Sequence, residues 1–305
     1  MDVADRAVLA RFGVGPAGRL GGGGEAEVYA LDPERVLRVH KNPGAADYVR
    51  RIGALYDDLD RAAVPYALPT VLDVDEDDQG SWSIERRLPG RSMDGLVTVV
   101  GGAARERMLR SYVDGAAAFG ALGRPRGWQG ACGELFTDAA LRADTWGDLL
   151  AARLRLQLEE GRTFLIEAGI DVDLVSERIL AEATLETAAA PTIVHGDYFP
   201  GNVLIGDDHE VSAVIDLGWL TVVGDPTHDV RTAVAFIDVR PWRRPGDAEV
   251  LLDAATTHLG GEAEAMIART RRYEQARFAF VADDEHLHRW CLDGLRTLAA
   301  EIAAP

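Results

Sequence analysis

Short apolar runs alternate with polar segments in the second half of the chain, and their spacing predicts a β-hairpin. Residues 193–194 are apolar and precede a polar loop, and residues 203–205 and 211–215 form the next two apolar runs. The segment between these two runs, residues 206–210, consists of residues that favour turns and longer hairpin loops. We therefore expect two paired strands, with the polar loop leading into the first.

Three polar side chains fall around the open end of this hairpin. If the hairpin folds symmetrically about His209, Asn202 lies opposite Asp216, and Asp197 lies on the loop that leads into it. Two oxygen-bearing side chains of this kind suit a hard divalent cation. The third could orient a hydroxyl or take its proton.

The remaining pattern predicts a strand-rich first part, residues 1–88, and a helix-rich second part, residues 89–305. A break at Leu88-Pro89-Gly90 marks the boundary. Period-two patterns predict strands at residues 28–31, 35–40, 71–74 and 81–85. Helical spacing predicts helices at residues 1–14, 45–60, 104–122, 146–170, 174–190, 228–239, 247–259 and 262–304, with a loop at 123–143.

Four consecutive glycines, residues 21–24, precede the first of these strands. Without a Cβ, a glycine-rich loop can bring backbone N–H groups close to phosphate oxygens. A flexible surface loop explains four glycines equally well. The glycines therefore support phosphate binding only together with other features.

Charge narrows the possible partners. The 305 residues include 50 acidic and 32 basic side chains, a formal charge of -18. This balance disfavours nucleic acid and anionic membranes as partners and favours cationic ligands.

We expect a cytoplasmic protein, because the sequence has two isolated cysteines, no visible signal peptide and no long apolar segment. The oligomeric state is not predicted.

The loop and hairpin together have the His-x-Asp, Asn and Asp spacing used for phosphoryl transfer. The segments 195–204 and 214–218 resemble the aminoglycoside phosphotransferase family, protein-kinase relatives that phosphorylate small molecules. Gly224-Asp225-Pro226, Asp229, the glycine loop and the Leu88-Pro89-Gly90 junction also fit. The resemblance implies an α+β, two-lobed protein-kinase-like fold with a small antiparallel-sheet N-lobe and a helical C-lobe that carries a catalytic β-hairpin. It also implies ATP or GTP and Mg2+ as cofactors.

By this resemblance, Asp197 is the catalytic aspartate, and Asn202 and Asp216 hold magnesium. His195 is a structural residue beneath the loop. Gly196 stands where protein kinases place an arginine that commonly meets an activation-loop phosphate, so control of that kind is not expected.

The same resemblance implies that residues of the strand-rich part bind the nucleotide. Arg38 takes the place of the family's phosphate-anchoring lysine, and Lys41 is the alternative. Asp47 is the candidate acid partner on the following helix. The full predicted nucleotide set is Gly22, Gly23, Gly24, Arg38 and Glu85.

Two further acids of the motif are expected to be structural. Asp225 is predicted to accept hydrogen bonds from backbone N–H groups of the catalytic loop. Asp229 is predicted to start a helix.

The expected acceptor is a small hydroxylated, cationic molecule such as an aminoglycoside or aminocyclitol. Acidic residues of the C-lobe support this by charge complementarity, although solvated helix faces explain any one of them. They are Asp144, Asp148, Glu159, Glu160, Asp171, Asp173, Asp283, Asp284 and Glu285. Segments near Arg38, residues 69–74 and residues 127–146 are also similar to hygromycin B phosphotransferases.

Other functions stay open. The chain could phosphorylate another small alcohol, such as a macrolide or a choline-like or homoserine-like molecule. It could also be a pseudokinase that binds nucleotide without turnover. A protein kinase is disfavoured, because only a short segment separates Asp216 from Gly224-Asp225-Pro226.

Overall fold

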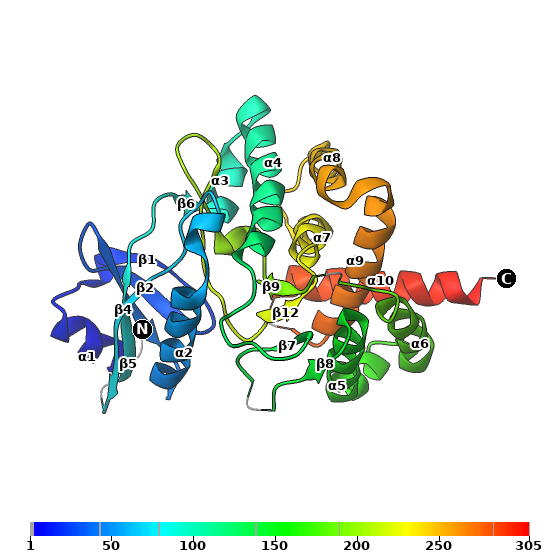
Figure 1. Ribbon diagram of the computed structural model, residues 1–305, viewed down its shortest axis with the longest axis horizontal. Coiled ribbons are helices and arrows are strands. Elements are labelled where there is room, and N and C mark those ends of the chain that lie inside the picture. The colour runs from blue at the N-terminus through cyan, green and yellow to red at the C-terminus, as the bar shows by residue number, and fades with distance from the viewer. Residues whose placement is uncertain are drawn as a thin grey trace.

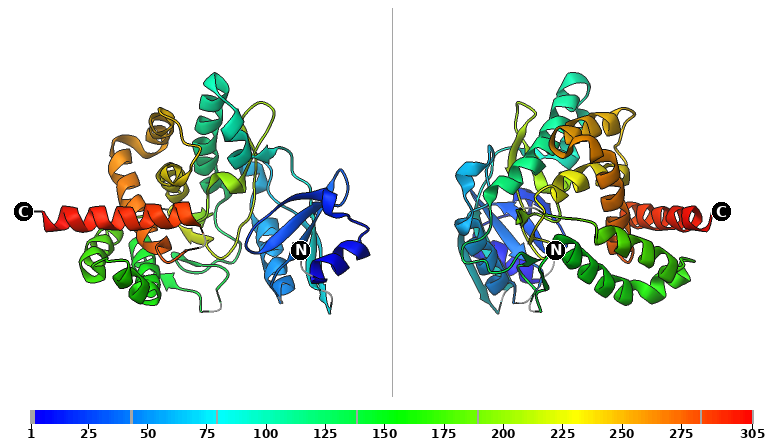
Figure 2. Two further views of the ribbon diagram at one scale, coloured as in Figure 1. Left: turned by 180° about the vertical axis from the view of Figure 1, so that it is seen from behind. Right: turned by 45° about the vertical axis from the view of Figure 1, so that its right-hand side comes forward.

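The chain folds into two lobes joined side by side. The structure is a computed structural model that describes residues 3–42, 44–78, 80–137, 139–188, 190–282 and 284–304. Figure 1 shows a small N-terminal lobe on the left and a larger helical lobe on the right, from which the last helix extends. The same separation is seen in both views of Figure 2.

The elements of the described residues are as follows. The helices are α1 (Val3–Arg11), α2 (Ala45–Asp58), α3 (Met93–Val99), α4 (Gly102–Phe119), α5 (Trp146–Glu167), α6 (Val172–Ala183), α7 (His228–Ala235), α8 (Asp247–Leu259), α9 (Ala263–Phe278) and α10 (Glu285–Ala303). The strands are β1 (Arg19–Gly22), β2 (Ala26–Ala30), β3 (Arg35–His40), β4 (Val71–Asp77), β5 (Gly80–Arg86), β6 (Arg91–Ser92), β7 (Cys132–Glu134), β8 (Arg142–Ala143), β9 (Thr192–Val194), β10 (Val203–Ile205), β11 (Val211–Val214) and β12 (Val222–Gly224).

An antiparallel sheet in the order β1-β2-β3-β5-β4 forms the N-lobe. Period-two alternation in β3 gives this sheet two different faces. Leu37 and Val39 are buried in a small core with Val8 and Leu9 of α1. Arg38 lies between them in sequence and therefore points to the opposite face, towards α2.

Helix α2 packs into the large core rather than the small one. Its residues Leu55 and Tyr56, and Leu59 just after it, are buried in a cluster with residues of α3, α4 and α7. The hydroxyl of Tyr56 also accepts a hydrogen bond of 3.0 Å from the backbone N–H of Leu217. Helix α2 is thus tied to the C-lobe through both apolar and polar contacts.

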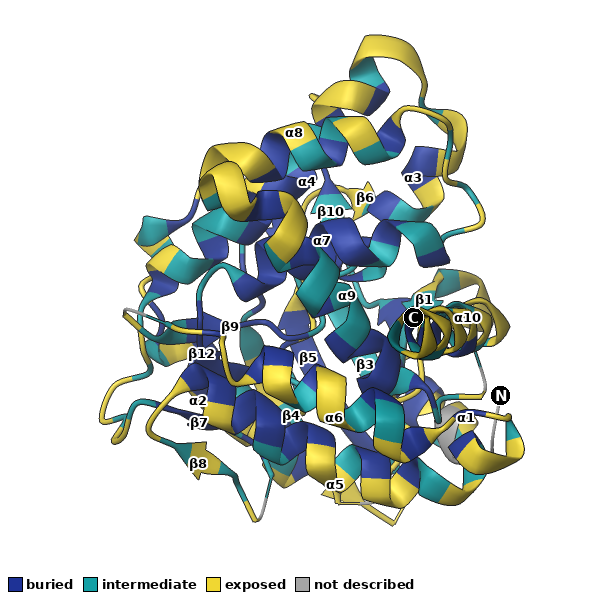
Figure 3. Cartoon of the chain, turned by 90° about the vertical axis from the view of Figure 1, so that its right-hand side faces the viewer, coloured by how far each residue is buried: buried dark blue, intermediate teal, exposed yellow. Residues whose placement is uncertain are grey.

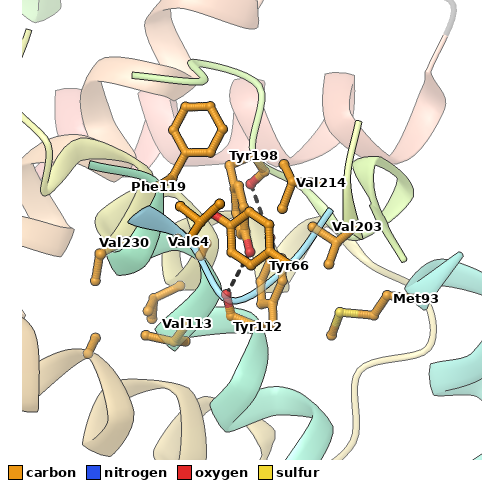
Figure 4. Packing of buried hydrophobic residues seen from close by; sticks show 14 of the residues in the cluster. Val64, Tyr66, Met93, Tyr112, Val113, Phe119, Tyr198, Val203, Val214 and Val230 are labelled. Atoms are coloured by element: carbon orange, nitrogen blue, oxygen red, sulfur yellow. Dashed lines mark hydrogen bonds between the residues drawn. The ribbon is translucent and has the colours of Figure 1, made fainter. Parts of the chain in front are cut away.

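The centre of the C-lobe is a dense core around α7, of which all residues are buried. Figure 3 shows α7 in dark blue, surrounded by helices with exposed outer faces. In Figure 4 the stacked rings of Tyr112 and Tyr198 lie within this core. Each hydroxyl donates to the other residue's backbone carbonyl, at 3.0 and 2.9 Å. These bonds fasten the loop that carries Asp197 to α4.

The expected two-lobed α+β fold is confirmed, but the sequence pattern misjudged some elements. The single helix expected at residues 262–304 is wrong, because α9 ends at Phe278 and α10 begins at Glu285. The side chain of Asp284 accepts from the N–H groups of His286 and Leu287 and so caps the start of α10. The loop expected at residues 123–143 contains β7 and β8, and these pair with β12 and each other. The sequence pattern missed these strands because two or three residues are too few to show an alternation of apolar and polar positions.

Candidate active site

The expected hairpin is present as β10 and β11, and a bulge shifts its register by one residue. Val203 pairs with Val214, but the pairing slips between Leu204 and Ile205. As a result the backbone N–H of Ile215 donates to the carbonyl of Asn202 at 2.9 Å. Asp216 therefore lies one residue beyond the position opposite Asn202, not directly opposite as expected.

Asp216 has an unusual backbone conformation. Its φ is 71°, in the left-handed region that residues other than glycine seldom adopt. This turn takes the chain out of the hairpin immediately after β11. Its carboxylate is 43% exposed, so it faces the space between the lobes. Such strain often accompanies functional sites.

Asn202 and Asp197 are hydrogen-bonded to each other. The side-chain nitrogen of Asn202 donates to a carboxylate oxygen of Asp197 at 3.2 Å and to its backbone carbonyl at 3.0 Å. In this orientation the amide oxygen of Asn202 remains available as a ligand. The sequence prediction that these two side chains converge is correct.

Burial changes the acid–base behaviour of Asp197. Desolvation raises its pKa above the ordinary value of 3.8, and the nearby charge of Asp216 adds to this effect. The positive charge of Arg277 acts in the opposite direction. A carboxylate with a raised pKa is a stronger base than one in water, which suits proton transfer from a hydroxyl.

His195 lies fully buried beneath the loop. Its Nδ1 accepts from the backbone N–H of Asp197 at 3.3 Å, and its Nε2 lies 2.8 Å from the carbonyl of Ile215. This network assigns the proton to Nε2, which donates to that carbonyl. The ring thus bridges the loop to the end of β11 and agrees with the predicted structural role.

The acid that supports the catalytic loop is Asp229, not Asp225. The Asp229 carboxylate is buried and accepts from the backbone N–H groups of His195 at 2.7 Å and Gly196 at 3.0 Å. Asp225 instead accepts from the backbone N–H of Thr227 and pairs with Arg231, at the start of α7. The predicted role of Asp225 is therefore wrong, whereas Asp229 lies in the first turn of α7, as predicted, and its carboxylate supports the loop in addition. Each fits a buried acceptor equally well in sequence, and only the fold decides which one reaches the loop.

Gly196 is required by the backbone. Its φ is 75°, and an added Cβ would overlap the backbone carbonyl of Leu220. An arginine would therefore not fit here without a change in the loop.

Arg38 faces the hairpin across the cleft. Its Nη2 is 3.0 Å from a carboxylate oxygen of Asp216, and its Nη1 is 3.7 Å from Glu85 of β5. Its Nε is buried and has no hydrogen-bond partner among the described residues. A buried donor of this kind is costly unless a ligand or water satisfies it.

Lys41 and Asp47, the other charged residues considered for this position, lie elsewhere. Lys41 donates to the carbonyl of Gly23 and pairs with Glu27 at 3.1 Å, so it braces the glycine loop. Asp47 is 91% exposed and pairs with Arg50 of its own helix. The prediction that Asp47 pairs with Arg38 is wrong. The acids next to Arg38 are instead Asp216 of the C-lobe and Glu85 of the neighbouring strand β5.

The glycine loop is the tight turn between β1 and β2. Gly22 pairs with Glu27, and the N–H of Gly23 donates to the carbonyl of Ala26. A Cβ at Gly23 or Gly24 would meet no atom of the described residues within 4 Å. The tip of the turn is therefore open to a ligand.

A cavity of about 270 Å³ lies between the lobes beside Arg38 and Asp216. Three other residues lining it, Glu25, Tyr48 and Trp219, received no functional role from the sequence. Trp219 is a half-exposed part of the cavity wall. The position of Glu25 directly after four glycines is the only signal that could have pointed to it.

Four of the nine acids expected at the acceptor site have local structural roles. Asp171 caps the start of α6, Asp148 binds the hydroxyl of Thr145 at the start of α5, and Asp173 pairs with Arg162. Asp284 caps α10, as described above, and Asp283 lies outside the described residues. Their charge is therefore explained without a ligand.

The described residues contain no group of three or more His, Cys, Asp or Glu side chains arranged to hold a metal ion. In the same part of the chain, no helix combines the length and the apolar character that crossing a membrane requires.

The comparison with solved structures finds the same fold in aminoglycoside phosphotransferases. A thermostable mutant of aminoglycoside phosphotransferase APH(4)-Ia in its apo form has a TM-score of 0.70 and 19% identity, and the match covers 98% of this chain and 99% of that one. A ternary complex of a thermostable mutant of the same enzyme with AMP-PNP and hygromycin B gives 0.69 and 18%, with complete coverage of both chains.

The gentamicin complex of APH(2")-IIa has a TM-score of 0.64 and 16% identity, and the match covers 97% of this chain and 96% of that one. No curated protein matches the sequence. The family model described as "Phosphotransferase enzyme family" matches residues 17–267, which include the glycine loop, the hairpin and α7. The chain therefore belongs to this family of phosphotransferases.

Proposed function

We propose that this protein is a nucleotide-dependent kinase that phosphorylates a hydroxyl of a small, cationic molecule such as an aminoglycoside or aminocyclitol antibiotic. One observation carries the proposal. Asp197 is hydrogen-bonded to Asn202 on one side of the cleft, while Asp216 faces Arg38 beneath an open glycine turn. This set of groups matches the needs of phosphoryl transfer, which are positioning and charge stabilisation.

In this proposal Asp197 orients the acceptor hydroxyl and receives its proton. Its raised pKa makes it a better base, and its hydrogen bond to Asn202 fixes its orientation. His195 and Asp229 hold the backbone of the loop, so that the carboxylate has a defined position before the acceptor binds.

Asn202 and Asp216 are proposed to hold Mg2+. An amide oxygen and a carboxylate fit this ion, because Mg2+ is commonly bound by one or two protein oxygens together with phosphate oxygens and water. When bound, the ion would offset negative charge on the phosphates.

Arg38 is proposed to anchor the nucleotide phosphates. Its unpaired, buried Nε is a donor without a partner among the described residues, and a planar guanidinium binds phosphate oxygens well. Gly22, Gly23 and Gly24 would cover the phosphates, and Glu85 would hold the guanidinium in place. Residues 1–88 would thus bind nucleotide, ATP or GTP, and residues 89–305 would supply the acceptor site.

The solved relatives support the choice of ligands. One APH(4)-Ia structure contains AMP-PNP and hygromycin B, and one APH(2")-IIa structure contains gentamicin. Their identity to this chain is below 20%, so the acceptor needs a direct test.

The test is a coupled nucleotide-turnover screen with the purified protein across aminoglycosides, macrolides and amino alcohols. A productive acceptor should become heavier by one phosphoryl group, as measured by mass spectrometry. Asp197→Ala should abolish turnover while its thermal unfolding stays cooperative. Unchanged turnover in Asp197→Ala would refute the assignment. Stabilisation by nucleotide without turnover on any acceptor would instead indicate a nucleotide-binding pseudokinase.

A further inference from the structure

Trp219 is a large apolar side chain that remains half exposed beside the active site. It lies three residues after Asp216, and 47% of its surface is accessible. One face of its indole is stacked on Tyr48 of α2, with ring centroids 4.5 Å apart and planes 14° apart. Tyr48 is itself held edge-on by Phe136 at 5.7 Å. The indole is therefore held by Tyr48, which is itself fixed by a second aromatic ring from another part of the chain.

Glu25 reaches Trp219 from the opposite lobe. It follows the four glycines at the tip of the β1–β2 turn, and its side chain is hydrogen-bonded to Trp219. Partial burial raises the pKa of Glu25, and the like charge of Asp216 adds to the shift. A carboxylate that is partly desolvated and close to another carboxylate attracts a cation.

Both residues line the 270 Å³ cavity that also contains Arg38 and Asp216. The cavity thus offers an aromatic surface and an anionic group next to the proposed phosphate and metal site. An aminosugar or aminocyclitol ring has the matching chemistry, because its C–H groups can pack on an aromatic face and its ammonium can pair with a carboxylate.

We propose that Trp219 and Glu25 bind one ring of the acceptor, with the indole against the ring's C–H groups and the carboxylate on an ammonium. The proposal rests on the proposed kinase function and narrows its substrates to amine-bearing rings. Neither residue is needed for the transfer step itself, so they would determine which acceptor binds. The C-lobe acids that cap helices would then contribute less to recognition than Glu25.

A nucleotide base is the competing occupant of the indole face. Two features favour the acceptor. Trp219 lies three residues after Asp216, at the phosphate end of the proposed nucleotide site. The Glu25 carboxylate would also attract an ammonium, a group that a nucleotide base lacks.

The test compares Trp219→Ala, Trp219→Phe and Glu25→Gln with two matched controls. Leu72→Ala removes an apolar side chain with the same 47% exposure, outside the cavity. Asp47→Asn removes an exposed acid of α2 that, among the described residues, pairs only with Arg50. The kinetic constants are measured with ATP and with the aminoglycoside for which the wild type has the lowest KM.

Trp219→Ala and Glu25→Gln should each raise the KM for the aminoglycoside by about tenfold or more, as expected for the loss of a stacking or charge contact. The KM for ATP and the kcat should stay near the wild-type values, and Trp219→Phe should lie between wild type and Trp219→Ala. Glu25→Gln should have no effect on a neutral, amine-free acceptor. The two controls should behave as wild type.

The failures of the two proposals can be told apart. If the wild type phosphorylates an aminoglycoside but the variants keep its KM, the ring-binding site is refuted and the kinase function stands. A rise in the KM for ATP alone would assign the indole to the nucleotide and would also refute the site. If the wild type transfers phosphate to no acceptor, both proposals fail. If Trp219→Ala does not fold, the KM of Trp219→Phe for the aminoglycoside tests the ring-binding site instead.

Discussion

The carboxylate of Asp229 is the main support of the catalytic loop, and its replacement tests whether the loop geometry controls catalysis. Asp229→Asn keeps the size and shape of the side chain. One amide oxygen can still accept from the backbone N–H of either His195 or Gly196, but the NH2 group then faces the other N–H. The substitution thus removes one buried hydrogen bond and the negative charge that strengthens both.

Hydrogen bonds to a charged group contribute about 1.5–3 kcal/mol each to stability. Asp229→Asn should therefore lower the free energy of unfolding by roughly 2–3 kcal/mol. Asp229→Ala leaves two backbone N–H groups buried and unpaired, and its cost should be about 2–6 kcal/mol. For a domain of this size, the asparagine variant should unfold roughly 4–12 °C lower than the wild type.

The loss of activity in Asp229→Asn should be larger than the loss of stability alone would cause. A shift of about 1 Å in the Asp197 carboxylate can reduce the rate by about a hundredfold. We therefore expect kcat of Asp229→Asn to fall by about this factor at a temperature where the variant is fully folded. The KM for ATP should change little, because Asp229 does not contact the nucleotide side of the cleft.

Asp225→Asn is the matched control, because Asp225 is a buried acid just before α7 that bonds to Thr227 and Arg231 rather than to the loop. It should lose stability, as expected for a buried ion pair, and keep its kcat. Thermal unfolding followed by calorimetry and steady-state kinetics on the same preparations provide the comparison. A wild-type kcat in Asp229→Asn would refute the role of this carboxylate in positioning the loop.

Four further outcomes are expected. Arg38→Met should reduce kcat/KM for ATP by roughly ten- to a hundredfold, which steady-state kinetics would show, whereas Lys41→Met should have a smaller effect. Gly196→Ala should lower both Tm and kcat, because alanine is disfavoured at a φ of 75° and its Cβ would meet the carbonyl of Leu220. Burial, together with the charge of Arg38, lowers the pKa of His40 to about 4 from 6.5. The unfolded chain then binds more protons between these values, so Tm should fall as the pH drops through this range, and less so in His40→Asn. EDTA should stop turnover and Mg2+ restore it; turnover that persists in EDTA would contradict a magnesium site.

The hairpin and its polar side chains could be predicted from sequence because the information is local. Strand alternation and turn residues lie within about twenty positions of each other, and together they bring Asp197, Asn202 and Asp216 close in space. The error of one residue arose because the turn is centred on Asp208 rather than His209, and the bulge between Leu204 and Ile205 offsets only part of that shift. A bulge adds a residue to one strand without changing its apolar pattern, so periodicity does not reveal it.

The partner of Arg38 could not be predicted, because it depends on contacts between distant parts of the chain. Asp216 is 178 positions from Arg38 in sequence. Asp47 was the nearest plausible acid, but helix α2 is rotated so that this side chain faces solvent. The sequence also could not show which of Asp225 and Asp229 binds the catalytic loop, since only the packing of α7 decides which carboxylate lies under that loop.

The packing of α2 explains why its sequence lacks a partner for Arg38. In protein kinases, the position of the corresponding helix controls whether its glutamate reaches the phosphate-binding lysine. Here α2 is fixed to the C-lobe by Leu55 and Tyr56, and the hydroxyl of Tyr56 binds the chain just after Asp216. A helix held in this way has no separate active position to reach.

The stabilising acid can then come from the sheet itself, and Glu85 on the strand next to β3 fills this place. Arg38 thus pairs with Glu85 within the sheet and more closely with Asp216 of the C-lobe, and neither acid belongs to α2. Gly196 leads to the same conclusion independently, because an arginine that could bind an activation-loop phosphate does not fit there. Two of the devices by which protein kinases are switched are thus replaced by fixed contacts in this chain.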